Sequence, residues 1–304
     1  LDKLAPIEFA VGIFTNLSRE HLDFHGTMEN YLAAKAKLFD RCRVGLFNAD
    51  DAAGRTLLQN ARCRAVSYGL TPPCDYLAEE IESRGVRGST YILHTKNARF
   101  RIKTQIPGTF TLYNTLAAAA AARECGVDLV CIQNALYALR GIAGRLEKVN
   151  LGFAGGAFTA FIDYAHTPFA LENLLRCVRA FRGTGQRIVT LFGCGGDRDR
   201  SKRPEMGRIA TANSDYVIIT SDNPRGEDPQ TIIRDILGGV GAADNYKVIE
   251  NRREAIEYAV ANALAGDIIL LVGKGHEQYE IDKDGLHPFS ETEIVQEAAE
   301  RYRS

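Results

Sequence analysis

Residues 267–277 read Asp-Ile-Ile-Leu-Leu-Val-Gly-Lys-Gly-His-Glu. The run from Ile268 to Val272 is apolar at every position, so it predicts a strand buried on both faces, as in a parallel sheet covered by helices on each side. A polar segment that carries glycines follows at once, from Gly273 to Glu277. In folds of this class, ligands bind beyond the carboxyl ends of the strands. The stretch therefore predicts an α/β domain with its ligand site at that end of the sheet.

The same alternation of strand and helix extends upstream to residue 158. Strands are predicted over residues 158–162, 188–192, 216–220, 247–250 and 268–272, and helices over residues 168–181, 204–212, 229–237 and 252–265. Regular alternation of this kind indicates a doubly wound, Rossmann-like domain.

Residues 1–146 combine two patterns. Predicted strands at 9–15, 44–47 and 65–68 alternate with predicted helices at 29–42 and 51–61, and two further helices are predicted at 112–124 and 129–139. Between Tyr76 and Ile106, apolar residues recur at every second position, which predicts small antiparallel strands. Gly141 and Gly144 then interrupt a helical pattern, so we expect two domains, residues 1–146 and 147–304.

The composition is that of an ordinary globular protein. Of the 304 residues, 45% are hydrophobic and 25% are charged, which excludes a disordered, collagen-like or coiled-coil chain. Lys and Arg (37) balance Asp and Glu (38) without a long basic run, so we expect no nucleic-acid partner. No apolar run reaches the roughly 18 residues that a membrane span needs, so we expect none.

Seven cysteines are scattered along the chain without a Cys-x-x-Cys pair. This pattern is typical of reduced thiols in a cytoplasmic protein rather than of a zinc or redox site. The chain opens at Leu1, without an initiating methionine or the basic and apolar regions of a signal peptide. We therefore expect it to be a piece of a longer protein.

Polar segments follow four predicted strands of the second domain. They are residues 163–168, 193–204, 221–225 and 273–277. The second segment has glycines that allow close backbone approach, and it precedes a predicted helix whose N-terminus attracts anions. Its basic residues are Arg198, Arg200, Lys202 and Arg203. A ligand site is favoured here, and ordinary solvated loops are the alternative.

The segment Asp222-Asn223-Pro224-Arg225 places an acid, an amide and a guanidinium on a short turn stiffened by proline. An arginine can bind a carboxylate through two parallel hydrogen bonds, while Asp222 or Glu277 could receive an ammonium group. This combination complements a zwitterion. A plain type I turn would explain the same four residues without a ligand.

Lys35 is an anomaly in the first domain, because it falls within the apolar stripe of the helix predicted over residues 29–42. Such a lysine must extend its ammonium group to water, pair with an acid or lose its charge. A neutral amine could react with carbon dioxide to give a carbamate, which could hold magnesium. Upstream, His21 and Asp23 supply further metal or substrate ligands, although a lone histidine is more often structural.

Taken together, these segments resemble the Mur ligases, and within that family the branch that adds meso-diaminopimelate to the peptidoglycan precursor. The resemblance runs over the whole chain, and eight motifs in a fixed order make it specific. The motifs are residues 15–26 (Thr-Asn-Leu-Ser-Arg-Glu-His-Leu-Asp-Phe-His-Gly), 31–35 (Tyr-Leu-Ala-Ala-Lys), 113–114 (Tyr-Asn), 144–147 (Gly-Arg-Leu-Glu), 163–168 (Asp-Tyr-Ala-His-Thr-Pro), 193–204, 222–225 and 273–277.

The resemblance implies roles for individual residues. Lys35 would be a carbamylated lysine and His21 a magnesium ligand. The nucleotide would lie near Asn114 and Arg145, approached from the second domain by Asp163, His166 and Lys202. The catalytic residues implied are Lys35, His21, His166 and Lys202. meso-Diaminopimelate would be bound by Arg198, Asp222, Asn223, Pro224, Arg225, Gly273 and Glu277.

The implied reaction is ATP-dependent amide formation, with Mg²⁺, in the cytoplasm. ATP would phosphorylate the free carboxylate of the D-glutamate in UDP-N-acetylmuramoyl-L-alanyl-D-glutamate, and the amine of meso-diaminopimelate would attack the acyl phosphate. An arginine left unpaired by lysine, which lacks the second carboxylate, would select against lysine. The implied fold is the later part of the Mur-ligase central, ATP-binding domain followed by a Rossmann-like C-terminal domain that binds the amino acid.

The sequence departs from the family at its beginning. It has no G-x-x-x-x-G-K-[ST] phosphate loop, no UDP-binding domain and no glutamate-bearing segment to complete a magnesium site. We therefore expect the missing N-terminal region to be required for activity. Two alternatives stay open, a non-catalytic amino-acid-binding or interaction module, and a lysine-adding or folylpolyglutamate-type ligase. The missing phosphate loop supports the first, and residues 222–225 argue against the second.

Overall fold

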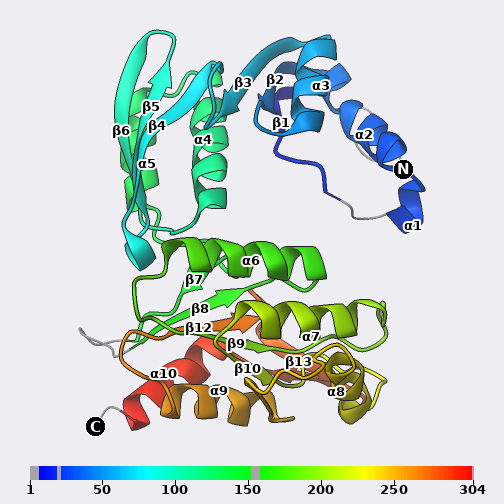
Figure 1. Ribbon diagram of the computed structural model, residues 1–304. Coiled ribbons are helices and arrows are strands. Elements are labelled where there is room, and N and C mark those ends of the chain that lie inside the picture. The colour runs from blue at the N-terminus through cyan, green and yellow to red at the C-terminus, as the bar shows by residue number, and fades with distance from the viewer. Residues whose placement is uncertain (1–6, 19–21, 152–157, 303–304) are drawn as a thin grey trace. The chain divides into compact units, whose positions relative to one another are not determined.

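The chain folds into two compact units, residues 1–140 and 141–304. The computed structural model describes residues 7–18, 22–151 and 158–302. The division falls six residues before the boundary expected at residue 146, within the same glycine-bearing segment. Each unit has its own sheet and core (Figure 1).

The first unit is built on a six-stranded sheet. Its strands, in the order in which they lie in the sheet, are β1 (Phe9–Phe14), β2 (Cys42–Asn48), β3 (Arg64–Gly69), β4 (Tyr76–Ser83), β5 (Ser89–Thr95) and β6 (Ala98–Thr104). Strands β1 to β4 are parallel, whereas β4, β5 and β6 pair in antiparallel fashion. The antiparallel strands expected between Tyr76 and Ile106 are therefore confirmed.

The helices in the described part of this unit are α1 (Leu22–His25), α2 (Met28–Ala36), α3 (Ala52–Asn60), α4 (Thr109–Glu124) and α5 (Leu129–Ala138). Helix α3 packs against β2 and β3, helix α4 packs on the opposite face against β1 to β4, and helix α5 packs against β6. Successive strand residues point to opposite faces. In β2, Leu46 packs with Leu116 of α4, while the next residue, Phe47, packs with Leu57 of α3.

The helix expected over residues 29–42 is wrong in its second half. Helix α2 ends at Ala36, and a 3-10 turn at Phe39–Arg41 follows it. Phe39 is buried in this turn, where its ring lies 4.5 Å from that of Phe47. Cys42 already belongs to β2, paired with Phe9. The apolar residues at 38 and 39 therefore serve a turn that packs on the sheet, and they do not extend a helical stripe.

The second unit is a doubly wound α/β domain, as expected. Its six-stranded sheet has the order β11 (Tyr246–Val248), β10 (Tyr216–Ile219), β9 (Ile188–Phe192), β12 (Ile268–Val272), β8 (Thr159–Asp163) and β7 (Glu147–Lys148), and only β7 is antiparallel. The helices are α6 (Pro168–Phe181), α7 (Lys202–Asn213), α8 (Pro229–Leu237), α9 (Arg252–Ala261) and α10 (Glu291–Arg301). Figure 1 shows α6 and α7 on one face of the sheet and α9 and α10 on the other.

The strand order decides where the polar segments meet. Strands β10, β9, β12 and β8 are consecutive neighbours in the sheet and run parallel to one another. The four polar segments that follow them therefore leave the sheet at the same edge, side by side. From β8 through β9 and β10 to β11, the chain adds strands in one direction across the sheet, and it then returns to place β12 between β9 and β8. Such folds bind ligands beside the strands where this direction reverses.

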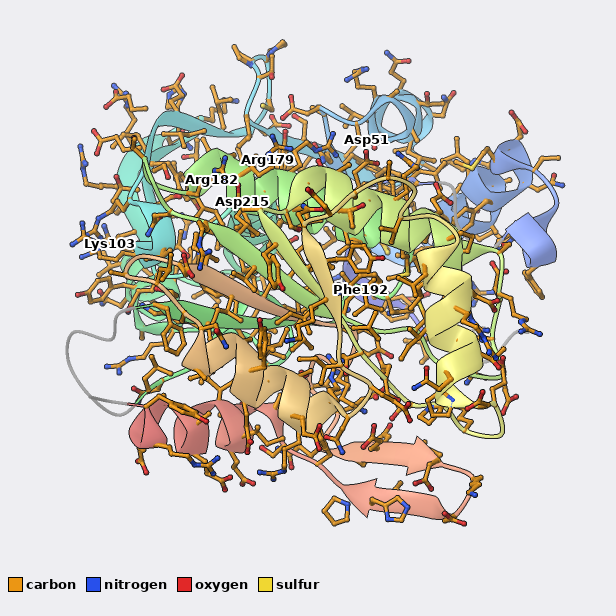
Figure 2. All side chains as sticks on the ribbon, turned by 60° about the horizontal axis from the view of Figure 1, so that its bottom comes forward. Asp51, Lys103, Arg179, Arg182, Phe192 and Asp215 are labelled. Carbon is orange, nitrogen blue, oxygen red and sulfur yellow. The ribbon has the colours of Figure 1, made fainter. Side chains whose placement is uncertain are left out.

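A small hairpin and the last helix were not predicted. Strands β13 (Tyr279–Asp282) and β14 (Gly285–Pro288) form a separate two-stranded sheet, which Figure 2 shows apart from the six-stranded one. Gly285 adopts a φ of 129°, which favours glycine at the turn.

Helix α9 ends at Ala261, four residues earlier than expected, and a turn then leads into β12. Within the described ranges, the helices are too short or too polar to cross a bilayer.

Candidate functional site

Asn223 lies at the centre of the polar edge of the second unit. Its side-chain Nδ2 donates a hydrogen bond to Oε2 of Glu277 over 2.8 Å, which links the segments after β10 and β12. Its backbone carbonyl accepts a bond of 2.9 Å from the amide of Gly196, which links the segment after β9 as well. Asn223 is buried, whereas Glu277 is half-buried. Through its side chain and its backbone carbonyl, Asn223 thus joins three of the four predicted segments.

Arg225 lies on the same turn and reaches back across it. Its Nη1 donates to the carbonyl oxygens of Gly196 (3.0 Å) and Asn223 (3.3 Å). Nothing in the described ranges pairs with its Nε or Nη2, so an edge of the half-buried guanidinium stays available for a ligand. Gly196 must be glycine here, because a Cβ would overlap the carbonyl oxygen of Pro224.

Asp222 is less available than the sequence suggested. The residue is buried, and its Oδ1 lies 3.6 Å from the ammonium of Lys274. Gly273, at a φ of 119°, brings the backbone so close that a Cβ would press on the Asp222 carboxylate at 2.5 Å. Of the two acids proposed to receive an ammonium group, Glu277 is therefore the more accessible.

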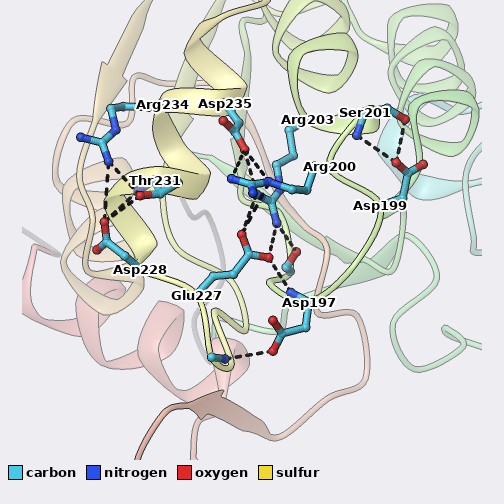
Figure 3. Close-up of polar contacts among 12 residues, drawn as sticks. Asp197, Asp199, Arg200, Ser201, Arg203, Glu227, Asp228, Thr231, Arg234 and Asp235 are labelled. Carbon is cyan, nitrogen blue, oxygen red and sulfur yellow. Dashed lines mark hydrogen bonds and ion pairs between the residues drawn. The ribbon is translucent and has the colours of Figure 1, made fainter.

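An ion-pair network centred on Arg203 links the segment after β9 with the residues that follow Arg225 (Figure 3). Arg203 has a fully buried side chain, and it donates to Glu227 from Nη2 (2.8 Å) and to Asp235 from Nη1 (2.9 Å). Glu227 in turn accepts the amide of Asp197 over 2.6 Å. The amide of Gly226 closes the link by donating to the carboxylate of Asp197 over 3.0 Å.

Arg203, one of the four basic residues of the segment at residues 193–204, is engaged in ion pairs within the protein. Its guanidinium is committed to Glu227 and Asp235, and Arg200 also contacts Asp235 over 3.2 Å. Arg198 remains exposed on the same segment and donates only to the neighbouring carbonyl of Asp197 within the described ranges. The network thus fixes the segment that carries Arg198 against the turn that carries Arg225.

Glu227 gives the second unit a pH dependence. Hydrogen bonds from Arg203 and from the Asp197 amide hold the pKa of Glu227 at about 2, below its ordinary value of 4.5. A carboxyl group whose pKa is depressed by folding stabilises the fold above its unfolded-state pKa, and this contribution disappears as the pH falls through the folded-state pKa. We predict that the urea concentration at the unfolding midpoint decreases as the pH is lowered from about 4.5 to about 2, and that it decreases less in Glu227→Gln. Equal pH dependence of both proteins would contradict the assignment.

A second cluster lies at the end of β8, around Tyr164. The Nδ1 of His166 lies 2.8 Å from the carbonyl oxygen of Tyr164, and Lys202 donates to the carbonyl of His166 over 2.8 Å. The guanidinium carbon of Arg145 lies 5.5 Å above the Tyr164 ring. The structure therefore brings together three of the residues expected near the nucleotide.

Asp163 has a different position from these three residues. It is buried, and its two carboxylate oxygens accept the amides of Leu146 (2.7 Å) and Ala165 (2.9 Å). Burial raises the pKa of Asp163, while these hydrogen bonds and the charge of Arg145 oppose the rise. Through the hydrogen bond from Leu146, Asp163 holds the segment at residues 144–146 against the end of β8.

Of the candidate residues of the first unit, the structure describes Lys35 and Asn114, which lie on different helices. Lys35 is half-buried on α2, with its Nζ 4.8 Å above the ring of Tyr31, and α2 contains no fully buried residue. Asn114 is exposed on α4. His21 lies outside the described residues. In the ranges that are described, no three His, Cys, Asp or Glu side chains gather as a metal site would require.

Comparison with known sequences now assigns the two units. Residues 1–122 match the Mur ligase middle domain, and residues 144–275 match the Mur ligase glutamate ligase domain. The chain belongs to the Mur ligase family. This confirms the resemblance in sequence and fold, with the middle domain preceding the C-terminal domain.

Individual relatives of this Mur ligase carry more specific names. The chain is 43% identical to the UDP-N-acetylmuramoyl-L-alanyl-D-glutamate–2,6-diaminopimelate ligase of Clostridium botulinum over 98% of its own length and 60% of the relative's. It is 41% identical to the ligase of the same name from Syntrophomonas wolfei, over 98% of this chain and 61% of that one. The chain thus spans about 60% of the length of the curated relatives it matches.

Solved structures agree with the assignment. A diaminopimelate ligase structure superimposes with a TM-score of 0.69 at 34% identity, covering 99% of this chain and 62% of that chain. A folylpolyglutamate synthase from Mycobacterium tuberculosis gives a TM-score of 0.68 at 19% identity, covering 96% of this chain and 63% of that chain. The second likeness shows a shared fold alone.

The sequence pattern does not single out two buried charged residues of this Mur ligase, Lys274 and Arg252. Lys274 is fully buried, although it belongs to a polar segment. The buried guanidinium of Arg252 pairs with Glu291 at 2.8 Å and donates to the carbonyls of Ser221 and Val272. The sequence offers one signal for Lys274, a charged residue shortly after an apolar strand. That signal does not predict burial, because the partners of Lys274 and Arg252 are distant in the sequence.

Proposed function

We propose that this chain contributes the amino-acid-binding domain and part of the ATP-binding domain of a ligase. The ligase joins meso-diaminopimelate to the D-glutamate of UDP-N-acetylmuramoyl-L-alanyl-D-glutamate in peptidoglycan synthesis. The observation that carries the proposal is the placement of Arg225 and Glu277 on either side of Asn223, both half-buried and both in contact with it. A cation and an anion fixed together in this way complement an amino acid.

The amino-acid site is proposed to use opposite charges for opposite ends of the ligand. Arg225 would bind a carboxylate through the nitrogens it leaves free, and Glu277 would accept an ammonium group. Arg198, exposed on the adjoining segment, would bind a further carboxylate. Asp222, Pro224 and Gly273 would shape the turn rather than contact the ligand through charge.

Amide formation from a carboxylate requires activation, which ATP would supply as an acyl phosphate. The cations Arg145 and Lys202, with His166 beside them, are suited to phosphate, and Asn114 is proposed to contact the nucleotide from the first unit. Asp163 would position this segment through its two backbone contacts.

Magnesium is proposed to bind at Lys35, as its carbamate, and at His21. The described ranges bring no three His, Cys, Asp or Glu side chains together for this ion, and the ammonium of Lys35 lies over the Tyr31 ring. A carbamate would change that side chain from a cation to an anion with oxygen donors, which are the donors that magnesium prefers.

The cytoplasm is the proposed location of the reaction. The cysteines support this, because the structure places none of the seven in a disulfide, and disulfides form mainly in oxidising compartments. ATP, required by the proposed reaction, is a cytoplasmic substrate.

The test is an assay of the chain extended to the length of its relatives. We expect ADP formation that requires both the UDP-linked dipeptide and meso-diaminopimelate, together with a product that contains a new amide. ADP formation that responds to L-lysine and not to meso-diaminopimelate would contradict the proposal.

A further inference from the structure

Lys274 is a fully buried lysine whose ammonium contacts three oxygen atoms. Its Nζ lies 2.8 Å from Oδ1 of Asn223, 3.0 Å from the carbonyl oxygen of Tyr279 and 3.6 Å from Oδ1 of Asp222. The two closest partners are neutral oxygens, and the carboxylate of Asp222 is the most distant of the three. The ammonium of Lys274 is therefore placed to orient the side-chain amide of Asn223 as well as to neutralise the carboxylate of Asp222.

The contact with Asn223 has only one possible polarity. An ammonium group donates hydrogen bonds and accepts none, so it can face only the oxygen end of an amide. The backbone amide of Ile281 donates to the same Oδ1 over 3.0 Å. With its oxygen held by two donors, Asn223 must direct Nδ2 toward Oε2 of Glu277, where the observed bond is 2.8 Å long.

We propose that Lys274 is a positioning residue for the amino-acid site, holding the Asn223 amide in the orientation that fixes the Glu277 carboxylate for an ammonium ligand. The inference rests on the proposed function. A reversed amide would place Oδ1 against Oε2 of Glu277, two acceptors without a proton between them. Without Lys274, the side-chain amide of Asn223 would be freer to rotate. The Glu277 carboxylate would then lose the hydrogen bond that Nδ2 of Asn223 donates to it.

A purely structural role would predict a different environment for Lys274. A methionine would fill a similar volume without the cost of burying a charge, and burial does lower the pKa of this ammonium group. The surrounding charged groups are Asp222, Arg252, Glu280 and Glu291. The nearest contacts of Nζ, however, are directed at the turn that carries Asn223 and at the first residue of β13.

Two measurements test the proposal in the intact chain. The first is the exchange rate of the Asn223 side-chain amide protons, followed by NMR without any ligand. We expect slow exchange in the parent chain and faster exchange in Lys274→Met. The second is calorimetric titration with meso-diaminopimelate, for which Lys274→Met is expected to lower the affinity about tenfold or more, as for a hydrogen bond to a charged group.

A double-mutant cycle separates positioning from general destabilisation. If Lys274 acts through Asn223, then Lys274→Met on an Asn223→Ala background should change the affinity by less than about twofold. The control is Arg187→Met, which breaks an ion pair of 2.6 Å with the buried carboxylate of Asp267 at the opposite edge of the same sheet. We expect this control to lower the melting temperature and leave the affinity unchanged.

Each result bears on a separate claim. Unchanged amide exchange and affinity in a folded Lys274→Met chain would overturn the inference, and so would an equal loss on the Asn223→Ala background. If the parent chain does not bind meso-diaminopimelate, the proposed function fails in this chain while the exchange rates still decide the role of Lys274. If Lys274→Met does not fold, Lys274→Gln, which keeps an N–H donor, replaces it. Slow exchange in Lys274→Gln would support the inference, and fast exchange with unchanged affinity would overturn it.

Discussion

Replacing Arg225 with alanine is expected to weaken the binding of meso-diaminopimelate by about 2 to 4 kcal/mol, or about 30- to 1,000-fold in Kd. The reason is that its guanidinium is already oriented by the carbonyls of Gly196 and Asn223, while Nε and Nη2 have no partner in the described ranges. A carboxylate can therefore bind without first ordering the side chain. Calorimetric titration of the parent chain and of Arg225→Ala measures the difference.

Two matched variants define what the loss means. Arg225→Lys keeps the charge but removes the planar pair of donors, so we expect it to recover only part of the affinity. Arg234→Ala removes an exposed arginine whose only acidic contact in the described ranges is Asp228 at 3.8 Å, and we expect no change in Kd. Equal affinities of Arg225→Ala and the parent chain would show that Arg225 does not contact the ligand.

Replacing Arg203 with methionine is expected to lower the free energy of unfolding by about 3 kcal/mol, the lower end of the range for breaking a buried ion pair. The lower end applies because Glu227 and Asp235 keep partial access to water, with side-chain exposures of 19% and 33%, whereas Arg203 has none. Urea unfolding near neutral pH measures the effect. Affinity for meso-diaminopimelate should fall as well, since the network joins the segments that carry Arg198 and Arg225.

Arg200 supplies the matched control for Arg203. It also contacts Asp235, at 3.2 Å, but its side chain is 59% exposed. Exposed ion pairs contribute little, so Arg200→Met should cost less than about 1 kcal/mol. Equal losses for Arg200→Met and Arg203→Met would mean that burial of the pair does not matter and that the network does not hold the two segments.

The sequence was most informative where apolar runs were long and uninterrupted. Strand β9 and helices α6 and α8 have the predicted bounds, because an apolar run or an amphipathic stripe lies between clear turn residues. The parallel arrangement then brings the polar segments after β8, β9, β10 and β12 to one edge. Both the doubly wound fold and the grouping of those segments could therefore be predicted from local patterns.

The strand order and the buried charges could not be predicted in the same way. Arg203 pairs with Glu227 and Asp235, which lie 24 and 32 residues further along the chain, so no local pattern distinguishes it from the exposed Arg200. Lys274 contacts Asn223 across 51 residues. In the first unit, Lys35 seemed to interrupt an apolar stripe only because the helix was extended past Ala36, where the chain turns instead.

The most direct test of the account is a calorimetric titration of the chain with meso-diaminopimelate and, under the same conditions, with L-lysine. Circular dichroism first establishes that the chain is folded. The account predicts saturable binding of meso-diaminopimelate and much weaker binding of L-lysine, because lysine lacks the second carboxylate and would leave a cation of the site unpaired. Equal or tighter binding of L-lysine, or no binding of meso-diaminopimelate, would contradict it.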